Sequence, residues 1–294
     1  MNIWITGAAG FLGQRLAQRF STLGHTVIGL SRRKSAFADK SVEIDLSADD
    51  AVLRLQALRD EAGLPEVIIH TASRQPGPWP LSEFVKSNVL ATANLWEALK
   101  SSLPEKVIYT STLSVYNLPA ENPVSECQAA GGARPYPATK RWAEQICELF
   151  SRQTQVIILR LPSLYGAGQA DSFIDGLARL ALRDKPIELF SRGELVRDAL
   201  HVSDVVAAIA ACVELPREAG PCLMNLGAGR EIRTIEYAKT LVQALDSKSE
   251  IIPVDSRAAQ LDLHADIGTA RRTIGFNPTD LHESMKRYAN ELRT

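Results

Sequence analysis

The sequence predicts an α/β protein built around a parallel, doubly wound sheet, with a smaller α/β lobe formed by the C-terminal part. The first observation is a short apolar run at residues 2–6, followed at once by the glycine-rich stretch 7–13 and a helical pattern. The second is a regular alternation of apolar strands and amphipathic helices up to residue 160. Such alternation is typical of βαβ units, so it favours a parallel sheet with helices on both faces.

The glycine-rich stretch has the spacing of a phosphate-binding turn between a strand and a helix. Gly7 allows a tight turn, Gly10 lets the backbone approach a pyrophosphate, and Gly13 lets the helix lie close to the sheet. The free N–H groups at the start of the helix then face the phosphates. A lone glycine triplet carries little information, but one directly after a strand predicts a dinucleotide site of the Rossmann type.

Apolar runs and periodicity place the other elements of the first half. The expected strands cover residues 25–30, 42–44, 66–71, 105–111 and 155–160. The expected helices cover residues 49–60, 81–100 and 136–151, and proline- or glycine-rich loops cover 74–80 and 118–135.

The second half is less regular. It predicts helices at 171–183 and at 203–214, the latter capped by Ser203, strands at 186–190, 196–202 and 221–226, and two or three final helices. We therefore expect a dinucleotide-binding domain at residues 1–165 and a substrate-binding lobe at 166–294 that closes a cleft with it. The segment around 196–226 can belong to the first domain, although it lies within the C-terminal part of the sequence.

Composition excludes several classes of protein. The chain has 294 residues, 45% hydrophobic and 23% charged, and a net charge of -1, so neither nucleic acid nor a membrane surface is an expected partner. No apolar run approaches the roughly 20 residues of a membrane span, and the first residues lack a signal-peptide pattern. The four cysteines show no CxxC spacing, so we expect no metal site, no disulfides and a cytoplasmic location.

A tyrosine and a lysine, Tyr136 and Lys140, are spaced by one helical turn, so their side chains share one helix face. Two hydroxyls, Ser111 and Thr112, lie at the end of the strand expected at 105–111. Such a set can exchange a proton with a substrate oxygen while a nicotinamide exchanges a hydride. An ammonium about 5 Å from a phenol contributes roughly 3 kcal/mol toward the phenolate at an effective dielectric of about 20. We therefore expect Lys140 to lower the pKa of Tyr136 toward neutrality.

Over nearly its whole length the chain resembles the extended short-chain dehydrogenase/reductases, the NAD(P)-dependent sugar epimerase/dehydratase family. The resemblance rests on six ordered blocks, at residues 6–13, 111–116, 136–140, 159–166, 196–205 and 225–227. It implies a reductase or epimerase of a nucleotide-activated sugar with Thr112, Tyr136 and Lys140 as catalytic residues. Thr112 is preferred to Ser111 because it lies four residues before Tyr116, as the family's hydroxyl does.

The resemblance also implies binding residues near the ends of the strands. The expected cofactor contacts are Gly7, Ala9, Gly10, Phe11, Leu12, Gly13, Ser31, Arg32, Arg33, Asp45, Leu46, Thr71, Ala72, Ser73, Asn88, Tyr136, Lys140, Leu161 and Ser163. The expected substrate contacts are Ser111, Thr112, Ser163 and Arg197, whose guanidinium suits a pyrophosphate.

Other polar residues are ambiguous in the sequence. Asp45 fits an adenine contact or a plain surface carboxylate, and Asn88 fits a helix-fixing residue or an ordinary buried polar one. His70 and His201 are interpreted as core histidines. Trp79, which stands between prolines, is interpreted as packing rather than as a wall of the substrate cleft.

The end of the second strand indicates the cofactor. NAD-binding relatives place an acidic residue there, where it accepts hydrogen bonds from the ribose hydroxyls. This sequence has Leu30, Ser31, Arg32, Arg33 and Lys34 instead. Arginine forks suit a 2′-phosphate that a carboxylate would repel, so we expect NADP(H) to be preferred over NAD(H).

Several positions depart from the family pattern. Ser163 replaces an asparagine, Ala199 an aromatic residue and Asn117 a glycine, which leaves open a reductase of a non-sugar ketone. A non-catalytic dinucleotide sensor is the alternative from another class of protein. Leu113 and Ser114 replace the Asp and Glu of the dehydratases, so no dehydratase activity is expected.

A homodimer is expected from two helices, 81–100 and 136–151. They carry more apolar residues than one sheet-facing stripe requires, notably Trp96, Trp142, Ile146 and Phe150. Family members pair through the equivalent helices, with twofold symmetry.

Overall fold

The computed structural model describes residues 1–117, 119–132, 134–170, 172–217, 221–255 and 262–293. The chain divides into two compact units. Unit 1 consists of Met1–Asn117, Ala129–Arg160 and Val206–Met224, and unit 2 consists of Leu118–Gln128, Leu161–Val205 and Asn225–Thr294.

Unit 1 is organised around a seven-stranded sheet with the order β10-β6-β5-β4-β1-β2-β3. Its strands are β1 (Asn2–Thr6), β2 (Thr26–Ser31), β3 (Lys40–Glu43), β4 (Val67–His70), β5 (Lys106–Thr112), β6 (Gln155–Leu161) and β10 (Pro221–Asn225). Its helices are α1 (Phe11–Thr22), α2 (Ala51–Ala62), α3 (Leu81–Phe84), α4 (Ala91–Leu99), α5 (Pro135–Glu148) and most of α7 (Val202–Glu214). The strand pairs from β3 to β5 are parallel, which confirms the doubly wound α/β fold.

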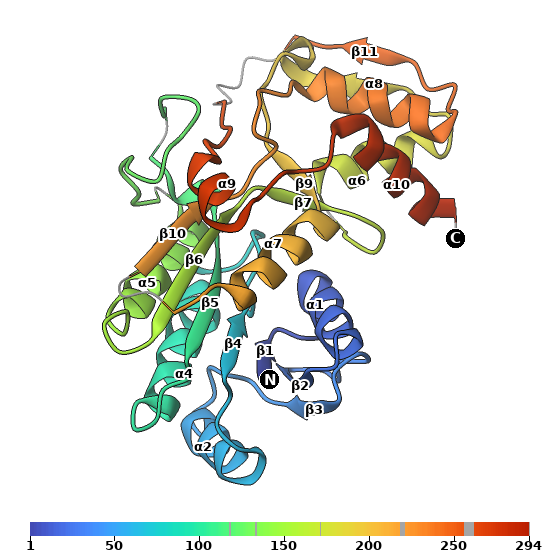
Figure 1. The fold of residues 1–294 in the computed structure, drawn as a ribbon. Helices are drawn as coiled ribbons and strands as arrows, with labels where there is room; N and C mark the ends of the chain where they lie inside the picture. The colour runs from blue at the N-terminus through green and yellow to red at the C-terminus, as the bar shows by residue number, and fades with distance from the viewer. Residues whose placement is uncertain (118, 133, 171, 218–220, 256–261, 294) are drawn as a thin grey trace. The chain divides into compact units, whose positions relative to one another are not determined.

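The direction of strand addition reverses beside β1. The chain moves from β1 outward to β3, then crosses to β4 on the other side of β1, where Thr6 lies opposite His70. Helices α4 and α5 cover one face of the sheet and α1 covers the other (Figure 1). In open α/β sheets, ligands bind at such a reversal, beyond the carboxyl ends of the strands. The topology therefore directs attention to the loops after β1 and β4.

Two predicted helices of unit 1 differ in detail from the sequence expectation. The helix expected at 81–100 contains a π-helical turn, η1 (Val85–Leu90), between α3 and α4. The helix expected to be capped by Ser203 begins one residue earlier. The Ser203 hydroxyl lies 2.8 Å from Nδ1 of His201, so it is used by a side chain rather than as an N-cap.

Unit 2 contains two small sheets, β11-β8 and β7-β9, and helices packed around a separate core. Its elements are β7 (Ser163–Tyr165), α6 (Phe173–Ala181), β8 (Ile187–Leu189), the short helical turn η3 (Phe190–Gly193), β9 (Ala199–His201), α8 (Thr234–Leu245), β11 (Ile251–Pro253), α9 (Gly268–Ile274) and α10 (Leu281–Arg293). Periodicity did not reveal the short strands β7 and β11. Residue 171, where the sequence analysis begins a helix, lies outside the described residues.

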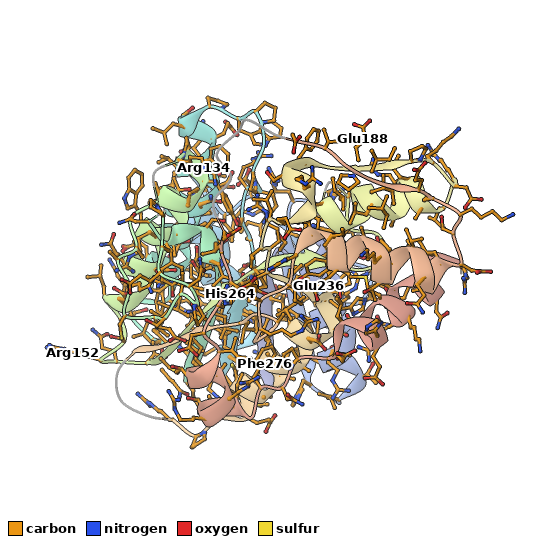
Figure 2. All side chains as sticks on the ribbon, turned by 90° about the horizontal axis from the view of Figure 1, so that it is seen from above. Arg134, Arg152, Glu188, Glu236, His264 and Phe276 are labelled. Carbon is orange, nitrogen blue, oxygen red and sulfur yellow. The ribbon has the colours of Figure 1, made fainter. Side chains whose placement is uncertain are left out.

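The start of α8 shows how unit 2 satisfies its helix ends. Glu236, which is labelled in Figure 2, lies in the first turn of α8. It accepts a hydrogen bond from the backbone N–H of Arg233 at 2.9 Å and pairs with Arg230 at 3.1 Å. A carboxylate in the first turn also complements the helix dipole. Among the described residues, no helix is long and apolar enough to cross a membrane.

Candidate functional site

The glycine turn after β1 has the backbone that the sequence predicts. Gly7 has φ of 68° and its N–H donates to Leu30 at 2.7 Å, which anchors the turn on β2. A Cβ on Gly7 would lie 2.9 Å from Ala72, so the turn also abuts the loop after β4. Gly10 is the N-cap of α1 and offers no side-chain capping bond. The first amides of α1 are therefore left to an external acceptor such as a phosphate.

Gly13 is required by close packing within the turn. A Cβ at this position would lie 2.2 Å from the carbonyl oxygen of Gly7, far inside van der Waals contact. The contact is with the turn itself, which refines the expectation that Gly13 serves helix–sheet packing.

A buried hydrogen-bond chain joins the loops on the two sides of the reversal. His70 is 1% exposed, and its Nδ1 lies 2.6 Å from the Thr6 hydroxyl and its Nε2 2.9 Å from the Thr92 hydroxyl. Thr92 donates to the carbonyl of Asn88, so His70 donates through Nε2 and accepts through Nδ1. Burial lowers the pKa of His70 to about 3, which keeps the ring neutral. This geometry agrees with the interpretation of His70 as a core histidine.

Asn88 ties the loop after β4 to α5. Its Oδ1 accepts from the N–H of Arg74 at 2.7 Å, and its Nδ2 donates to Thr139 at 3.0 Å. Asn88 lies within η1 and is 1% exposed. The π turn places this amide inside the protein, in line with the helix-fixing interpretation.

Two of the three expected catalytic side chains, Thr112 and Tyr136, lie together at the end of β5. The hydroxyls of Thr112 and Ser73 are close enough to the Tyr136 phenol to lower its pKa. The ring of Tyr136 also packs edge-on against Phe84, with centroids 6.3 Å apart. A phenol and two hydroxyls are thus gathered within unit 1, beside the loop that contacts the glycine turn.

Lys140 is almost completely buried below this cluster. It is 2% exposed, its Nζ donates to the carbonyl of Thr110 at 2.7 Å, and it lies 4.2 Å from the ring centroid of Tyr109. Burial lowers its pKa to about 7, and the charge of Glu144 acts in the opposite direction.

The pKa of Tyr136 differs from the sequence expectation. Burial raises it to about 12, and the hydrogen bonds from Thr112 and Ser73 offset only part of that effect. The expected lowering by Lys140 is not found, because desolvation of the phenolate dominates and the lysine is directed to Thr110. The phenol is the stable form at neutral pH in this environment.

Ser111 has a different partner from the one expected. It is 4% exposed and its hydroxyl donates to Glu144. Glu144 in turn receives Arg160 Nη2 at 2.8 Å. The Ser111 hydroxyl is therefore bonded within the core, and Thr112 is the hydroxyl beside Tyr136. A substrate contact of Ser111 stays a prediction.

The segment after β2, where the sequence predicts contact with the cofactor, is exposed and basic. Ser31 ends β2 and its hydroxyl bonds to the carbonyl of Arg33, while Arg32 and Arg33 extend into solvent. Asp39, the next acid along the chain, instead accepts from the N–H of Val27, near the start of β2. Asp45 accepts the N–H and hydroxyl of Ser47 at 2.9 and 2.7 Å.

The remaining expected contacts lie around these residues or in unit 2. The Leu46 carbonyl accepts from Asn94 at 2.8 Å, and the Thr71 hydroxyl donates to the Thr6 carbonyl at 2.7 Å. In unit 2, Ser163 is exposed in β7 and Arg197 is half-buried, with its N–H donating to Ile232 at 3.0 Å. Leu161, Ser163 and Arg197 belong to unit 2, so their binding roles stay predictions.

A comparison with family models decides the classification. The model described as the NAD dependent epimerase/dehydratase family matches residues 3–227. The chain belongs to this family. It is thus an enzyme of the epimerase type, as the resemblance to extended short-chain dehydrogenase/reductases implies.

Curated relatives and solved structures agree with the family. A UDP-glucuronate 4-epimerase of Thermodesulfobacterium geofontis is 25% identical over 97% of this chain and 94% of the relative. The structure of MoeE5 in complex with UDP-glucose and NAD is 29% identical with a TM-score of 0.86, covering 100% of this chain and 99% of that one. A UDP-glucose 4-epimerase from Thermotoga maritima shares the fold, with a TM-score of 0.87, 23% identity and coverage of 100% and 99%.

For a member of this epimerase family, the glycine turn fits a dinucleotide. The uncapped amides of α1, the positive φ of Gly7 and the lack of room for a Cβ at Gly13 together form a backbone surface for phosphates. The residues expected to contact the cofactor in unit 1 all follow β1, β2, β3 or β4 or lie on η1 and α5.

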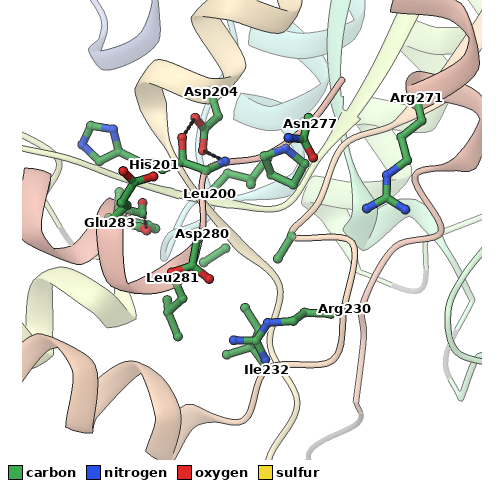
Figure 3. Close-up of a pocket in the computed structure, with 16 residues that line it drawn as sticks. Leu200, His201, Asp204, Arg230, Ile232, Arg271, Asn277, Asp280, Leu281 and Glu283 are labelled. Atoms are coloured by element: carbon green, nitrogen blue, oxygen red, sulfur yellow. Dashed lines mark hydrogen bonds between the residues drawn. The ribbon is translucent and has the colours of Figure 1, made fainter. Parts of the chain in front are cut away.

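Unit 2 of this family member contains a cavity of about 570 Å³ bordered by Asp204, Arg230, Arg271, Asp280 and Glu283 (Figure 3). Asp204 accepts the Thr279 hydroxyl at 2.6 Å, and Asp280 accepts the N–H of His282 at 2.8 Å. Of the described residues that line it, none is an expected catalytic or cofactor residue.

Two residues near Tyr136 and Lys140 were not predicted from the sequence. Glu144 and Thr139 lie on α5 and bond to residues distant in sequence, Arg160 and Asn88. The i, i+4 spacing of Lys140 and Glu144 was a usable signal for the first of them.

Proposed function

We propose that this protein is a nucleotide-sugar epimerase that inverts a sugar carbon through a nicotinamide dinucleotide, with a UDP-hexose or UDP-hexuronate as substrate. The observation that carries the proposal is the position of Thr112 and Tyr136 beside the loop that contacts the glycine turn, with Lys140 one helical turn after Tyr136. The relatives support the substrate class, since several are named UDP-glucuronate 4-epimerases and MoeE5 was solved with UDP-glucose or UDP-glucuronic acid and NAD.

In this mechanism the residues of the chain transfer one proton to and from the substrate and hydrogen bond to one sugar oxygen. When bound, the nicotinamide dinucleotide supplies the hydride acceptor and donor. Tyr136 takes the proton from the sugar hydroxyl and returns it, while Thr112 donates a hydrogen bond to the same sugar oxygen. Ser73 lies beside the phenol and favours its ionised form. Lys140 follows Tyr136 by one turn of α5, and its positive charge would add to this effect when substrate and dinucleotide are bound.

For the cofactor we infer a preference for NADP(H). The end of β2 offers Arg32 and Arg33 to solvent, whereas the nearby acid Asp39 is held by Val27 and Ser21 at the other end of the strand. A 2′-phosphate gains charge-assisted hydrogen bonds at such a site. MoeE5 was solved with NAD, so the preference for NADP(H) rests on this chain's own residues.

Elimination of water is not part of the proposed activity. Leu113 is 2% exposed and apolar, and Ser114 is an ordinary hydroxyl in the helical turn η2 (Leu113–Val115). Neither supplies the acid and base that removal of a sugar hydroxyl requires.

The assembly we propose is a homodimer in the cytoplasm. On α5, Trp142 is 42% exposed, and Leu149 directly after the helix is 75% exposed, so both offer apolar surface to a second copy. Trp96 is 2% exposed and stacks on Phe150 at 4.2 Å, so it supports this face from below rather than forming the contact. The four free thiols suit a reducing compartment.

Incubation with UDP-glucose, UDP-galactose, UDP-glucuronate and UDP-galacturonate tests the activity. NMR of the products should show an inverted sugar carbon with no loss of mass. Net oxidation of NADPH by a keto-sugar or a simple ketone, without inversion, would instead identify a reductase. Dinucleotide binding without any turnover would identify a sensor.

A further inference from the structure

One carboxylate of unit 1 is completely buried and lies one helical turn after Lys140. Glu144 has 0% exposure and accepts hydrogen bonds from three elements. On β5 the donor is the Ser111 hydroxyl. On β6 the donors are Arg160 Nε at 3.1 Å and Nη2 at 2.8 Å, and on α5 itself the donor is Arg141 Nη1 at 3.0 Å.

This arrangement needs an explanation beyond stability. Burying a carboxylate and a guanidinium costs solvation, and replacing such a pair by apolar side chains of similar volume is often neutral or stabilising. The packing of α5 on the sheet therefore does not require the charges. A role for the negative charge is to be sought in what lies beside it.

Lys140 is the neighbour that a negative charge affects. Its ammonium is desolvated, and its near contacts are neutral: the Thr110 carbonyl at 2.7 Å and the Tyr109 ring at 4.2 Å. The titratable and charged groups that face it come from three elements: His70 on β4, Tyr109 on β5, and Glu144 and Cys147 on α5. Arg160 on β6 is paired with Glu144. His70 is neutral and the thiol of Cys147 is held protonated by burial, with a pKa of about 12. Glu144 is the carboxylate of this set.

We propose that Glu144 is a positioning residue of the epimerase site: bonded to Ser111 and Arg160, it fixes the turn of α5 that follows Lys140 and supplies the negative charge that keeps Lys140 an ammonium. The role rests on the proposed function, because Lys140 acts there as the cation beside Tyr136. Ser111 belongs to this support, which explains why its hydroxyl is turned to the core.

The test measures the ionisation of Lys140 directly. The Cε chemical shift of Lys140 is followed against pH by NMR on lysine-labelled protein, with the signal assigned by its loss in Lys140→Arg. The wild-type midpoint is expected at about 7. In Glu144→Gln it should move down by about one pH unit or more, and the alkaline limb of turnover should move with it.

Glu148→Gln is the matched control. Glu148 lies on the same helix and shares Arg141, at 2.9 Å, but its side chain is 35% exposed and it does not bond to Ser111 or Arg160. Its midpoint and pH profile should equal those of the wild type. A Glu144→Gln variant with an unshifted midpoint would overturn the proposal, as would an equal shift in both variants.

A second variant removes the negative charge of Glu144 without leaving its buried partner Arg160 unpaired, so it is expected to fold. Glu144→Met combined with Arg160→Leu removes both ions, so no unpaired guanidinium is left to depress the lysine. A lowered Lys140 midpoint in this protein supports the proposal, and a wild-type midpoint overturns it. Because the NMR titration needs no substrate, failure to find epimerisation in the wild type would refute the proposed function without touching the link between Glu144 and Lys140.

Discussion

Gly13 in α1 and Gly176 in α6 are both glycines inside helices, one in each unit, and their surroundings are opposite. A Cβ at Gly13 would lie 2.2 Å from the Gly7 carbonyl, whereas a Cβ at Gly176 would meet nothing within 4 Å. The first glycine is required by a backbone turn and the second is merely tolerated. Tyr136 and Tyr288, Glu144 and Asp198, and Arg32 and Arg179 form similar pairs, with the first residue of each pair in unit 1 and the second in unit 2.

The largest expected effect is a difference in turnover between variants of two tyrosines, one in each unit. Tyr136→Phe should lower turnover by about 10²- to 10⁴-fold, because it removes the group that carries the proton, while dinucleotide binding is retained. Tyr288→Phe, in the aromatic core of unit 2, should leave turnover unchanged. Steady-state kinetics on both variants and a dinucleotide titration decide this. Near-normal turnover in Tyr136→Phe would refute the catalytic assignment.

Gly13→Ala should disrupt the glycine turn. The added methyl group must displace the Gly7 carbonyl, at a cost of about 3 kcal/mol. We expect lower stability in chemical denaturation and loss of dinucleotide binding in fluorescence titration. If the variant binds NADPH as the wild type does, the turn is not the phosphate site.

A pH effect distinguishes two buried carboxylates. Asp198 of unit 2 is 7% exposed and accepts two backbone N–H groups, from Ala228 at 2.7 Å and Ala265 at 2.9 Å. Burial raises its pKa to about 6. Since the folded state then binds the proton more tightly than the unfolded state, its contribution to stability falls as pH rises from about 4 to about 6, by about 2–3 kcal/mol, and is constant above.

Asp198→Asn removes this titration. The difference in unfolding free energy between wild type and variant should therefore decrease as pH rises through that window and then level off. A difference that stays constant with pH would show that Asp198 has an ordinary pKa. Glu144, by contrast, is surrounded by guanidinium groups.

The arginines after β2 give a smaller effect. Arg32→Ala and Arg33→Ala should each weaken NADPH binding by about tenfold through loss of a charge-assisted bond, and leave NADH binding nearly unchanged. Arg179→Ala, which removes an exposed ion pair of α6 with Asp175, should alter neither. Equal dissociation constants of the wild type for NADPH and NADH would contradict the preference.

The smallest effect is a gain. Gly176→Ala should stabilise the protein by about 0.5–1 kcal/mol, since alanine restricts the unfolded chain and the site has room for a methyl group. Thermal denaturation would show it as a small rise in midpoint with unchanged kinetics. A destabilised variant would mean that the space beside Gly176 is too small for a methyl group.

Sequence reasoning succeeded where the signal is local. The turn at Gly7, the alternation of strands and helices and the one-turn spacing of Tyr136 and Lys140 are written within a few residues, and the structure contains them. It failed where the partner is distant. The residues next to Ser111 in the sequence do not indicate its hydrogen bond to Glu144. The raised pKa of Tyr136 depends on burial by the folded protein, which a short stretch of sequence does not show.

The π turn in the first long helix lies where three parts of unit 1 meet. Such turns are rare and are frequently found at functional sites. In η1 the buried Asn88 bonds to Arg74 in the loop after β4 and to Thr139 on α5, and its carbonyl accepts the Thr92 hydroxyl that also contacts His70. A change of Asn88 would therefore disturb the loop beside the glycine turn and the helix that carries Tyr136 at the same time.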